Sequence, residues 1–280
     1  MQVILSHDVD HMSVWEHRKD LIIPKFLVRS HLELLLGRIS LKELALRYSD
    51  LAADRWERIE EVMALHERLG IRSCFFFGMA NGVGLSYPLR YAEAHVPRVL
   101  ARGFEAGVHG IAYADEAAIA EEHARFAAIS GRTDFGIRMH YLRKDENTLR
   151  KLAGTGYRFD ATSQEVRDPY RLHGMWEFPL LLMDGWAMNG TARYQKRDLS
   201  GAKDYTRMKL DEAERAGLRF ASILFHDRYY SPAFATWKAW YEWLLAHLVE
   251  RGHAFTTHKE AMKSLEGGSS FPQATGTSRS

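Results

Sequence analysis

Charged and metal-binding side chains follow four short apolar segments of this sequence, at the point where each segment ends. The first segment, residues 3–5, leads into SHDVDH, and the other three lead into His109-Gly110, Arg138-Met139-His140-Tyr141 and His226-Asp227. Any one of these groups alone would more often be a satisfied structural residue. Four such ends in one chain indicate a functional site.

The chemistry that these side chain types suit is metal-assisted hydrolysis. Carboxylates and imidazoles bind divalent metals and leave a position open for water. A metal lowers the pKa of that water and polarises a carbonyl oxygen, while a second carboxylate takes the water's proton and a histidine protonates a leaving amine. Asp8 and Asp10 suit two of these roles, and a spacing of two along a strand places both on one side.

Strand-like and helical patterns alternate along the chain, which predicts βαβ units and a largely parallel sheet or barrel. The carboxyl ends of parallel strands share one edge of such a fold, where active sites collect. The expected strands cover residues 3–5, 73–77, 106–109, 135–138, 157–160, 177–182, 220–225 and 254–256, and the expected helices cover residues 54–69, 115–129, 145–153 and 232–251.

Two segments fall outside this alternation. Residues 11–50 carry leucines at helical spacing with interleaved lysines and arginines, which predicts a helical hairpin inserted after the first strand. The same pattern would also suit a basic amphipathic surface for peripheral contact with the inner membrane. Residues 266–280 are rich in glycine, serine and threonine and are expected to be disordered, so a single domain is predicted over residues 1–265.

Composition narrows the function class. The chain has 280 residues, 46% of them hydrophobic, and a net charge of only +2, which gives no reason to expect a nucleic-acid partner. The one cysteine, Cys74, lies in an apolar run and is expected to be buried. The chain shows no signal peptide and no apolar run of the roughly 20 residues that would span a bilayer, so we expect a cytoplasmic protein.

The order and spacing of these groups resemble the polysaccharide deacetylase superfamily, the NodB-type domain of carbohydrate esterase family 4. SHDVDH, VHGIAY, RMHY and LFH are similar to its four motifs. The resemblance implies a distorted (β/α) barrel of about seven parallel strands with the helical insert. It also implies these roles: Asp8 as catalytic base, Asp10 and His109 as metal ligands, Arg138 orienting the base, the Tyr141 backbone N–H facing the oxyanion, and His226 as general acid.

The chain departs from the family pattern at one metal ligand. Tyr113 stands where the second motif has its second histidine, and His140 replaces a proline beside the expected site. His140 is our first candidate for the third ligand, with Tyr113 or water as alternatives. HDVD, GVHG and RMH together resemble the subgroup found in bacterial surface-polysaccharide biosynthesis.

The resemblance implies a metal-dependent N-deacylase that removes an acetyl or formyl group from an amino-sugar carried on a nucleotide or a polyprenyl phosphate. Zinc is the first expectation for the divalent metal, and manganese, cobalt and nickel are compatible. A catalytically inactive carbohydrate-binding relative and a non-sugar amide hydrolase are the alternatives.

Among smaller candidates, His7 is expected to face the core, His11 to be a turn residue, a neighbour of the ligands or a ligand, and Asp227 to cap a loop, while the role of Glu177 stays open. Asp160 would either orient His226, as an acidic residue does in the family, or serve as a structural cap. Trp176, Trp186 and Tyr229 are candidate sugar-stacking walls, with core or rim positions as the commoner alternative.

Overall fold

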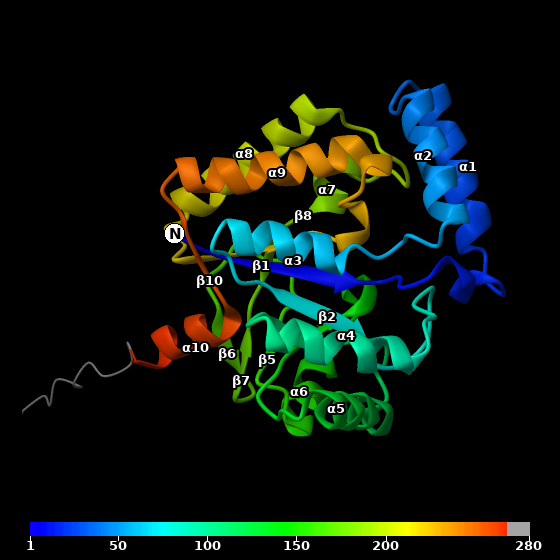
Figure 1. The fold of residues 1–280 in the computed structure, drawn as a ribbon. Helices are drawn as coiled ribbons and strands as arrows, with labels where there is room; N and C mark the ends of the chain where they lie inside the picture. The colour runs from blue at the N-terminus through cyan, green and yellow to red at the C-terminus, as the bar shows by residue number, and fades with distance from the viewer. Residues whose placement is uncertain (268–280) are drawn as a thin grey trace, which may run out of the picture.

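The computed structural model describes residues 1–267 and shows a curled, mostly parallel sheet surrounded by helices (Figure 1). The strands follow the order β6-β7-β5-β4-β3-β2-β1-β9-β8, β10 pairs with β1, and only the β6–β7 pair is antiparallel. This confirms the predicted distorted α/β barrel. Of the segment predicted to be disordered, residues 268–280 lie outside the described residues, and residues 266 and 267 belong to the last helix.

The strands are short, and the helices fall between them along the chain. The strands are β1 Gln2–Val9, β2 Cys74–Gly78, β3 Glu105–Gly110, β4 Ile137–Met139, β5 Phe159–Asp160, β6 Tyr170–Leu172, β7 Met175–Glu177, β8 Leu180–Met183, β9 Phe220–Leu224 and β10 Ala254–Thr256. The α-helices are α1 Ile22–Leu35, α2 Leu41–Ala52, α3 Ile59–Arg68, α4 Leu89–Ala101, α5 Glu116–Ser130, α6 Thr148–Thr155, α7 Asp184–Asn189, α8 Leu199–Arg215, α9 Ala235–Glu250 and α10 His258–Gly267. Short 3₁₀ turns are η1 Val14–His17, η2 His140–Leu142, η3 Asp227–Tyr229 and η4 Pro232–Phe234.

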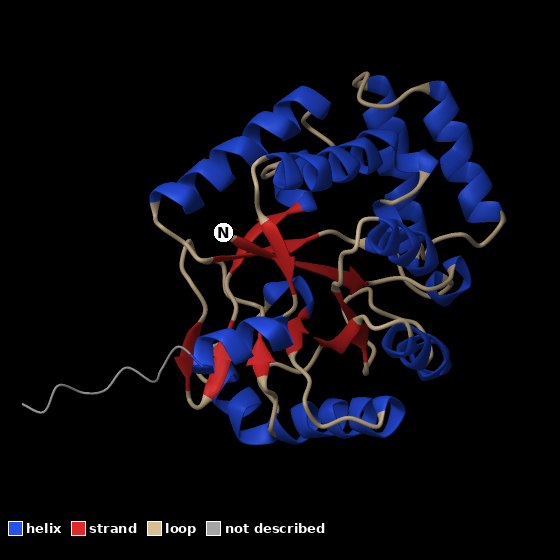
Figure 2. Cartoon of the chain, turned by 60° about the vertical axis from the view of Figure 1, so that its left-hand side comes forward, coloured by secondary structure: helices blue, strands red, loops and turns tan. Residues whose placement is uncertain are grey.

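Two clusters of buried apolar side chains form the core around the sheet. The larger one lies between the sheet and its helices, and in the smaller one His258 of α10 packs against Phe76, Phe159 and Phe178. Figure 2 shows the strands at the centre of the molecule with helices around them. Cys74 belongs to the smaller cluster and is buried, as expected. Burial on both faces explains why the strands read as continuous apolar runs.

The segment 177–182, predicted as one strand, contains the last residue of β7 and most of β8, which lie near opposite ends of the strand order. β7 pairs with β5, whereas β8 pairs with β9. Pro179 separates them, because proline has no N–H to donate to a ladder. The chain therefore crosses the open seam of the barrel here, and this crossing leads directly into α7.

The helical insert predicted after the first strand consists of η1, α1 and α2 (Figure 1). Ser40 and Glu43 form a capping box that starts α2. Glu33 of α1 is fully buried and accepts hydrogen bonds from Arg47 Nη1 (2.6 Å) and from Gln195 N (2.6 Å). Arg47 Nε donates to the Ala233 carbonyl (3.0 Å), so this buried pair ties the hairpin to the body of the molecule.

Candidate active site

The four strand ends that carry the chemical groups lie at one edge of the sheet. β4, β3, β2, β1 and β9 are consecutive neighbours, and all are parallel. His109 of β3 pairs in register with Arg138 of β4, and the Phe225 N–H, one residue before His226, donates to the Ser6 carbonyl. The sheet therefore brings together all seven predicted site residues.

Asp10, His109 and His140 form a tight cluster at this edge. His109 Nε2 lies 3.2 Å from Asp10 Oδ1 and 2.9 Å from His140 Nδ1, and His140 Nδ1 lies 3.3 Å from the same carboxylate oxygen. Both imidazoles are almost fully buried. Atoms bound about 2.0–2.2 Å from a zinc ion in a tetrahedral set lie about 3.3 Å from one another, so the spacing matches a ligand set.

The outer nitrogens of the two rings fix which nitrogen carries the proton. His109 Nδ1 lies 3.0 Å from the Arg138 carbonyl, and His140 Nε2 lies 3.2 Å from the Val83 carbonyl. A carbonyl only accepts hydrogen bonds, so both of these nitrogens carry hydrogen. In the neutral rings, His109 Nε2 and His140 Nδ1 then carry no hydrogen. Their lone pairs face each other and Asp10.

Such a cluster of acceptors suits a divalent cation. Asp10 Oδ1 is buried and has no hydrogen-bond donor. An ionised carboxylate, two oriented lone pairs and backbone carbonyls behind the rings fit a divalent metal, and three protein ligands leave a fourth position for water or substrate.

Asp8 lies beside this cluster and is oriented by Arg138. Arg138 Nη1 donates to Asp8 Oδ1 (3.0 Å) and to Ser6 Oγ (2.8 Å), and its Nε donates to the Ala161 carbonyl (2.9 Å). Asp8 Oδ2 lies 3.8 Å from His109 Nε2 and takes part in none of these bonds. Both side chains are buried, and the arginine orients Asp8 so that its other carboxyl oxygen faces the metal cluster.

His226 approaches the cluster from β9 and is oriented by an aspartate that the sequence did not reveal. Asp184 Oδ1 lies 2.9 Å from His226 Nδ1, and Asp184 Oδ2 accepts the His226 backbone N–H at 2.7 Å. Burial lowers the pKa of His226, but the Asp184 carboxylate outweighs burial and raises this pKa well above its usual range. His226 Nε2 lies 3.6 Å from Asp10 Oδ2, so the proton it carries points toward the site.

The proposal that Asp160 orients His226 is wrong. Asp160 bonds instead to Thr162 Oγ1 (2.6 Å) and to the Thr162 N–H (3.2 Å). It pairs in register with Glu177, and burial raises the pKa of both carboxyls. Asp184 is the first residue of α7. Pro179 was the available sequence signal, because a proline inside residues 177–182 argues against a single strand there.

Tyr141 has an unusual backbone at the mouth of the site. Its φ of 56° and that of Leu142, 53°, are both in the left-handed region, which non-glycine residues seldom adopt. The ring is 63% exposed, so side-chain burial does not impose this conformation. The turn is held at the end of β4, where such strain is typical of functional sites.

The remaining sequence candidates divide by environment. Tyr113 lies under the Arg143 guanidinium and its carbonyl accepts from Thr148, so its ring is engaged outside the cluster. His7 donates to the Phe225 carbonyl in the core. His11 contacts His17 (2.8 Å), beside the Asp20 carboxylate that His17 bonds. Asp227 caps the Arg58 N–H.

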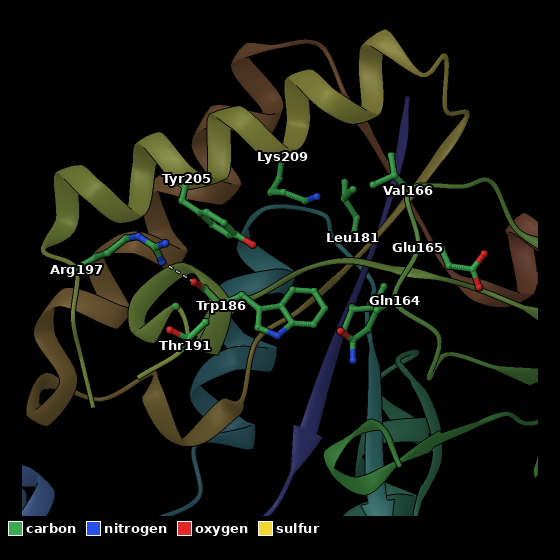
Figure 3. Close-up of a pocket in the computed structure, with 11 residues that line it drawn as sticks. Gln164, Glu165, Val166, Leu181, Trp186, Thr191, Arg197, Tyr205 and Lys209 are labelled. Atoms are coloured by element: carbon green, nitrogen blue, oxygen red, sulfur yellow. Dashed lines mark hydrogen bonds between the residues drawn. The ribbon is translucent and has the colours of Figure 1, made fainter. Parts of the chain in front are cut away.

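Of the three candidate sugar walls, only Tyr229 lies next to a site residue, with its ring 6.0 Å from that of His226. Trp176 is buried at the other end of the barrel, where its indole donates to Glu266. Trp186 lines a separate pocket of about 420 Å³ with Gln164, Tyr205 and Lys209 (Figure 3). None of the seven predicted site residues lines that pocket.

Comparison with known proteins supports the fold. Neither a family model nor a curated relative matches the sequence. Among solved structures, a candidate polysaccharide deacetylase from Mycobacterium smegmatis superposes with a TM-score of 0.64 at 14% identity, covering 100% of this chain and 94% of that one. A candidate polysaccharide deacetylase from Pseudomonas aeruginosa PAO1 gives 0.60 at 15% identity, with 97% and 92% covered.

The chain has the polysaccharide deacetylase fold. The PuuE allantoinase shares this fold with a TM-score of 0.62 at 15% identity, covering 97% of this chain and 91% of that one. The predicted resemblance is thus confirmed at the level of the fold.

Proposed function

We propose that this protein is a metal-dependent hydrolase that removes an N-acyl group, acetyl or formyl, from an amino-sugar intermediate of bacterial polysaccharide biosynthesis. The observation that carries the proposal is the meeting of three units at one sheet edge. These units are the Asp10–His109–His140 cluster, the Arg138–Asp8 pair and the Asp184–His226 pair. A module that only binds carbohydrate would need neither an arginine-oriented aspartate nor an aspartate-oriented histidine beside this cluster.

The residues divide the reaction between them. Asp8, ionised and held by Arg138, accepts a proton from the attacking water. His226, kept protonated by Asp184, donates a proton to the departing sugar amine. The Tyr141 backbone N–H, turned by its left-handed conformation, is the proposed donor to the oxyanion.

Asp10, His109 and His140 are the proposed metal ligands. A divalent ion bound there would polarise the acyl carbonyl and lower the pKa of a water. Zinc is our first expectation, because two imidazoles and one carboxylate form a common catalytic zinc set, and manganese, cobalt and nickel accept the same ligands.

The alternatives differ in how well this site supports them. The inactive-relative hypothesis rested on the missing histidine at position 113, and His140 places an imidazole in the cluster instead. Hydrolysis of a non-sugar amide stays a second candidate, because the allantoinase shares the fold to the same degree as the deacetylases.

Acyl release is the direct test. Purified protein, loaded with zinc or manganese, would be given N-acetyl and N-formyl amino-sugars on nucleotide and polyprenyl-phosphate carriers, with allantoin in parallel. We expect acetate or formate release from one sugar class, lost in Asp8→Asn. Release from allantoin alone would replace the sugar hypothesis, and no turnover of any substrate by metal-loaded protein would contradict the enzyme proposal. A cytoplasmic location, at the inner face of the membrane, is part of the same proposal.

A further inference from the structure

The hairpin formed by α1 and α2 exposes a concentration of large apolar side chains. Of the 13 large hydrophobic residues exposed in the described part of the chain, eight lie on residues 15–48. We call them the hairpin face: Trp15, Leu21, Val28, Leu32, Leu35, Leu36, Leu41 and Tyr48. Single exposed leucines are ordinary, but a gathering of this kind marks an interaction surface.

Part of this face is a regular stripe along α1. Leu21, Lys25, Val28, Leu32 and Leu35 are all exposed and follow one another at intervals of four, three, four and three residues. This spacing puts them on one side of a helix. The buried side of the helix carries Phe26, Ser30 and Glu33, so the stripe points away from the body of the protein.

The charge around the stripe has one sign. Every exposed charged residue between positions 15 and 50 is basic, namely Arg18, Lys19, Lys25, Arg38 and Lys42. The five acidic residues of the same segment are partly or fully buried and engaged: Glu16 and Asp20 with His17, Glu33 with Arg47, Glu43 with the Ala235 N–H and Asp50 with Arg58. The exposed surface of the hairpin therefore carries apolar and basic side chains, while its acidic side chains are bonded within the protein.

We propose that the hairpin face docks on the surface of an anionic lipid membrane. Apolar side chains next to lysine and arginine match the acyl boundary and the anionic headgroups of one leaflet. A second copy of the chain is a poorer partner, because a symmetric interface would set the basic rim of one face against the same rim of the other. Among residues 1–267 no helix is long and apolar enough to cross a bilayer, so the contact is interfacial.

The face lies close to the candidate site. The hairpin follows β1 directly and stands beyond its carboxyl end, the end that carries Asp8 and Asp10 (Figure 1). Ile22, at the start of α1, and the Tyr141 hydroxyl both lie against Gly84. Docking would hold the mouth of the site near the lipid surface, which favours a polyprenyl-linked substrate. That last step rests on the proposed function, whereas the docking itself does not.

Vesicle co-sedimentation of the full chain tests the docking. The probes are phosphatidylcholine vesicles with and without about 30% phosphatidylglycerol. The basic side chains of the hairpin should strengthen binding to the vesicles that contain the anionic lipid. We expect wild type to bind the anionic vesicles, and Val28→Glu/Leu35→Glu to lower the partition coefficient at least about tenfold. Lys25→Glu/Lys42→Glu should weaken binding and flatten its salt dependence.

Val249→Glu is the matched control, because Val249 is 60% exposed on α9, outside the hairpin. It should bind like wild type, and all variants should keep the far-UV spectrum and unfolding midpoint. Asp8→Asn should bind vesicles normally, which separates docking from catalysis. Absence of wild-type binding, equal loss in the Val249→Glu control, or a solution dimer that Leu35→Glu disperses would each overturn the proposal.

Discussion

At the scale of single residues, His109 and His140 each bond one ring nitrogen to a backbone carbonyl and face Asp10 with the other. The sequence predicted the residue types at this edge, because strand ends in a parallel sheet meet there. It could not predict the tautomers, which depend on the Arg138 and Val83 carbonyls behind the rings. The sequence also left the third ligand open between His140, Tyr113 and water, because spacing along the chain does not show which of them reaches Asp10 and His109.

Arg138 and Asp8 should be strongly coupled in stability. Arg138→Met leaves a buried carboxylate without its cation, and we expect it to lower the free energy of unfolding by about 3–5 kcal/mol. Asp8→Asn in the same background should cost much less than it does alone, because the unpaired charge is gone. Urea denaturation of wild type, the two single variants and the double variant measures this coupling. Additive changes in the free energy of unfolding would contradict the pairing.

Asp184 should set the alkaline limb of the pH–rate profile. A general acid works only while protonated, so activity is present below the pKa of His226 and is lost as pH rises through it. Asp184 raises that pKa, and Asp184→Asn should therefore move the alkaline limb to lower pH while leaving metal content unchanged. An unmoved limb with reduced rate would assign Asp184 a purely structural role.

At the scale of elements, the buried Glu33–Arg47 pair decides whether the hairpin stays on the body of the protein. Glu33→Ala leaves Arg47, which is 1% exposed, without its anion, at a cost of about 3–5 kcal/mol. We expect hydrogen exchange to rise first in α1 and α2, since the break is local. Leu35→Ala, at an 83% exposed position of the same helix, is the control and should change little; equal protection in both variants would contradict the anchoring role.

The pattern of elements was predictable where burial is strong and periodic. β2, β3 and β9 were expected close to their observed positions, because strands buried on both faces have continuous apolar sequences. β1 was expected over residues 3–5 but runs from Gln2 to Val9, so His7 and Asp8 lie inside the strand. α8 was missed, since its buried positions are small or polar, such as Ala202 and Thr206. α7 was missed because residues 177–182 were taken as one strand, and the residue that orients His226 was missed with it.

At the scale of the whole molecule, buried neutral histidines couple the fold to pH. His66 of α3 bonds Ser73 (3.0 Å) before β2 and Tyr241 (2.7 Å) of α9, so it joins three parts of the structure. Burial, together with Arg72, lowers the pKa of His66 from 6.5 to about 3. Its stabilisation is therefore present above pH 6.5 and declines as pH falls toward 3.

We expect this histidine to make the protein acid-sensitive. Wild type should lose about 2 kcal/mol of unfolding free energy between neutral pH and about pH 5 through His66 alone. His66→Gln should reduce the pH dependence by that amount while costing stability at neutral pH. Denaturant titrations at both pH values measure it, and an unchanged pH dependence would mean that His66 is not held neutral.

The proposed hydrolase activity depends on whether Asp10, His109 and His140 hold a metal ion. Elemental analysis of metal-replete, dialysed protein should find one divalent ion per chain in wild type and in His123→Ala, whose ring packs on Phe135 away from the site. Asp10→Ala, His109→Ala and His140→Ala should each lose it. A metal-free wild type, or a His140→Ala variant that keeps its full metal content, would contradict the ligand set and the hydrolase proposed from it.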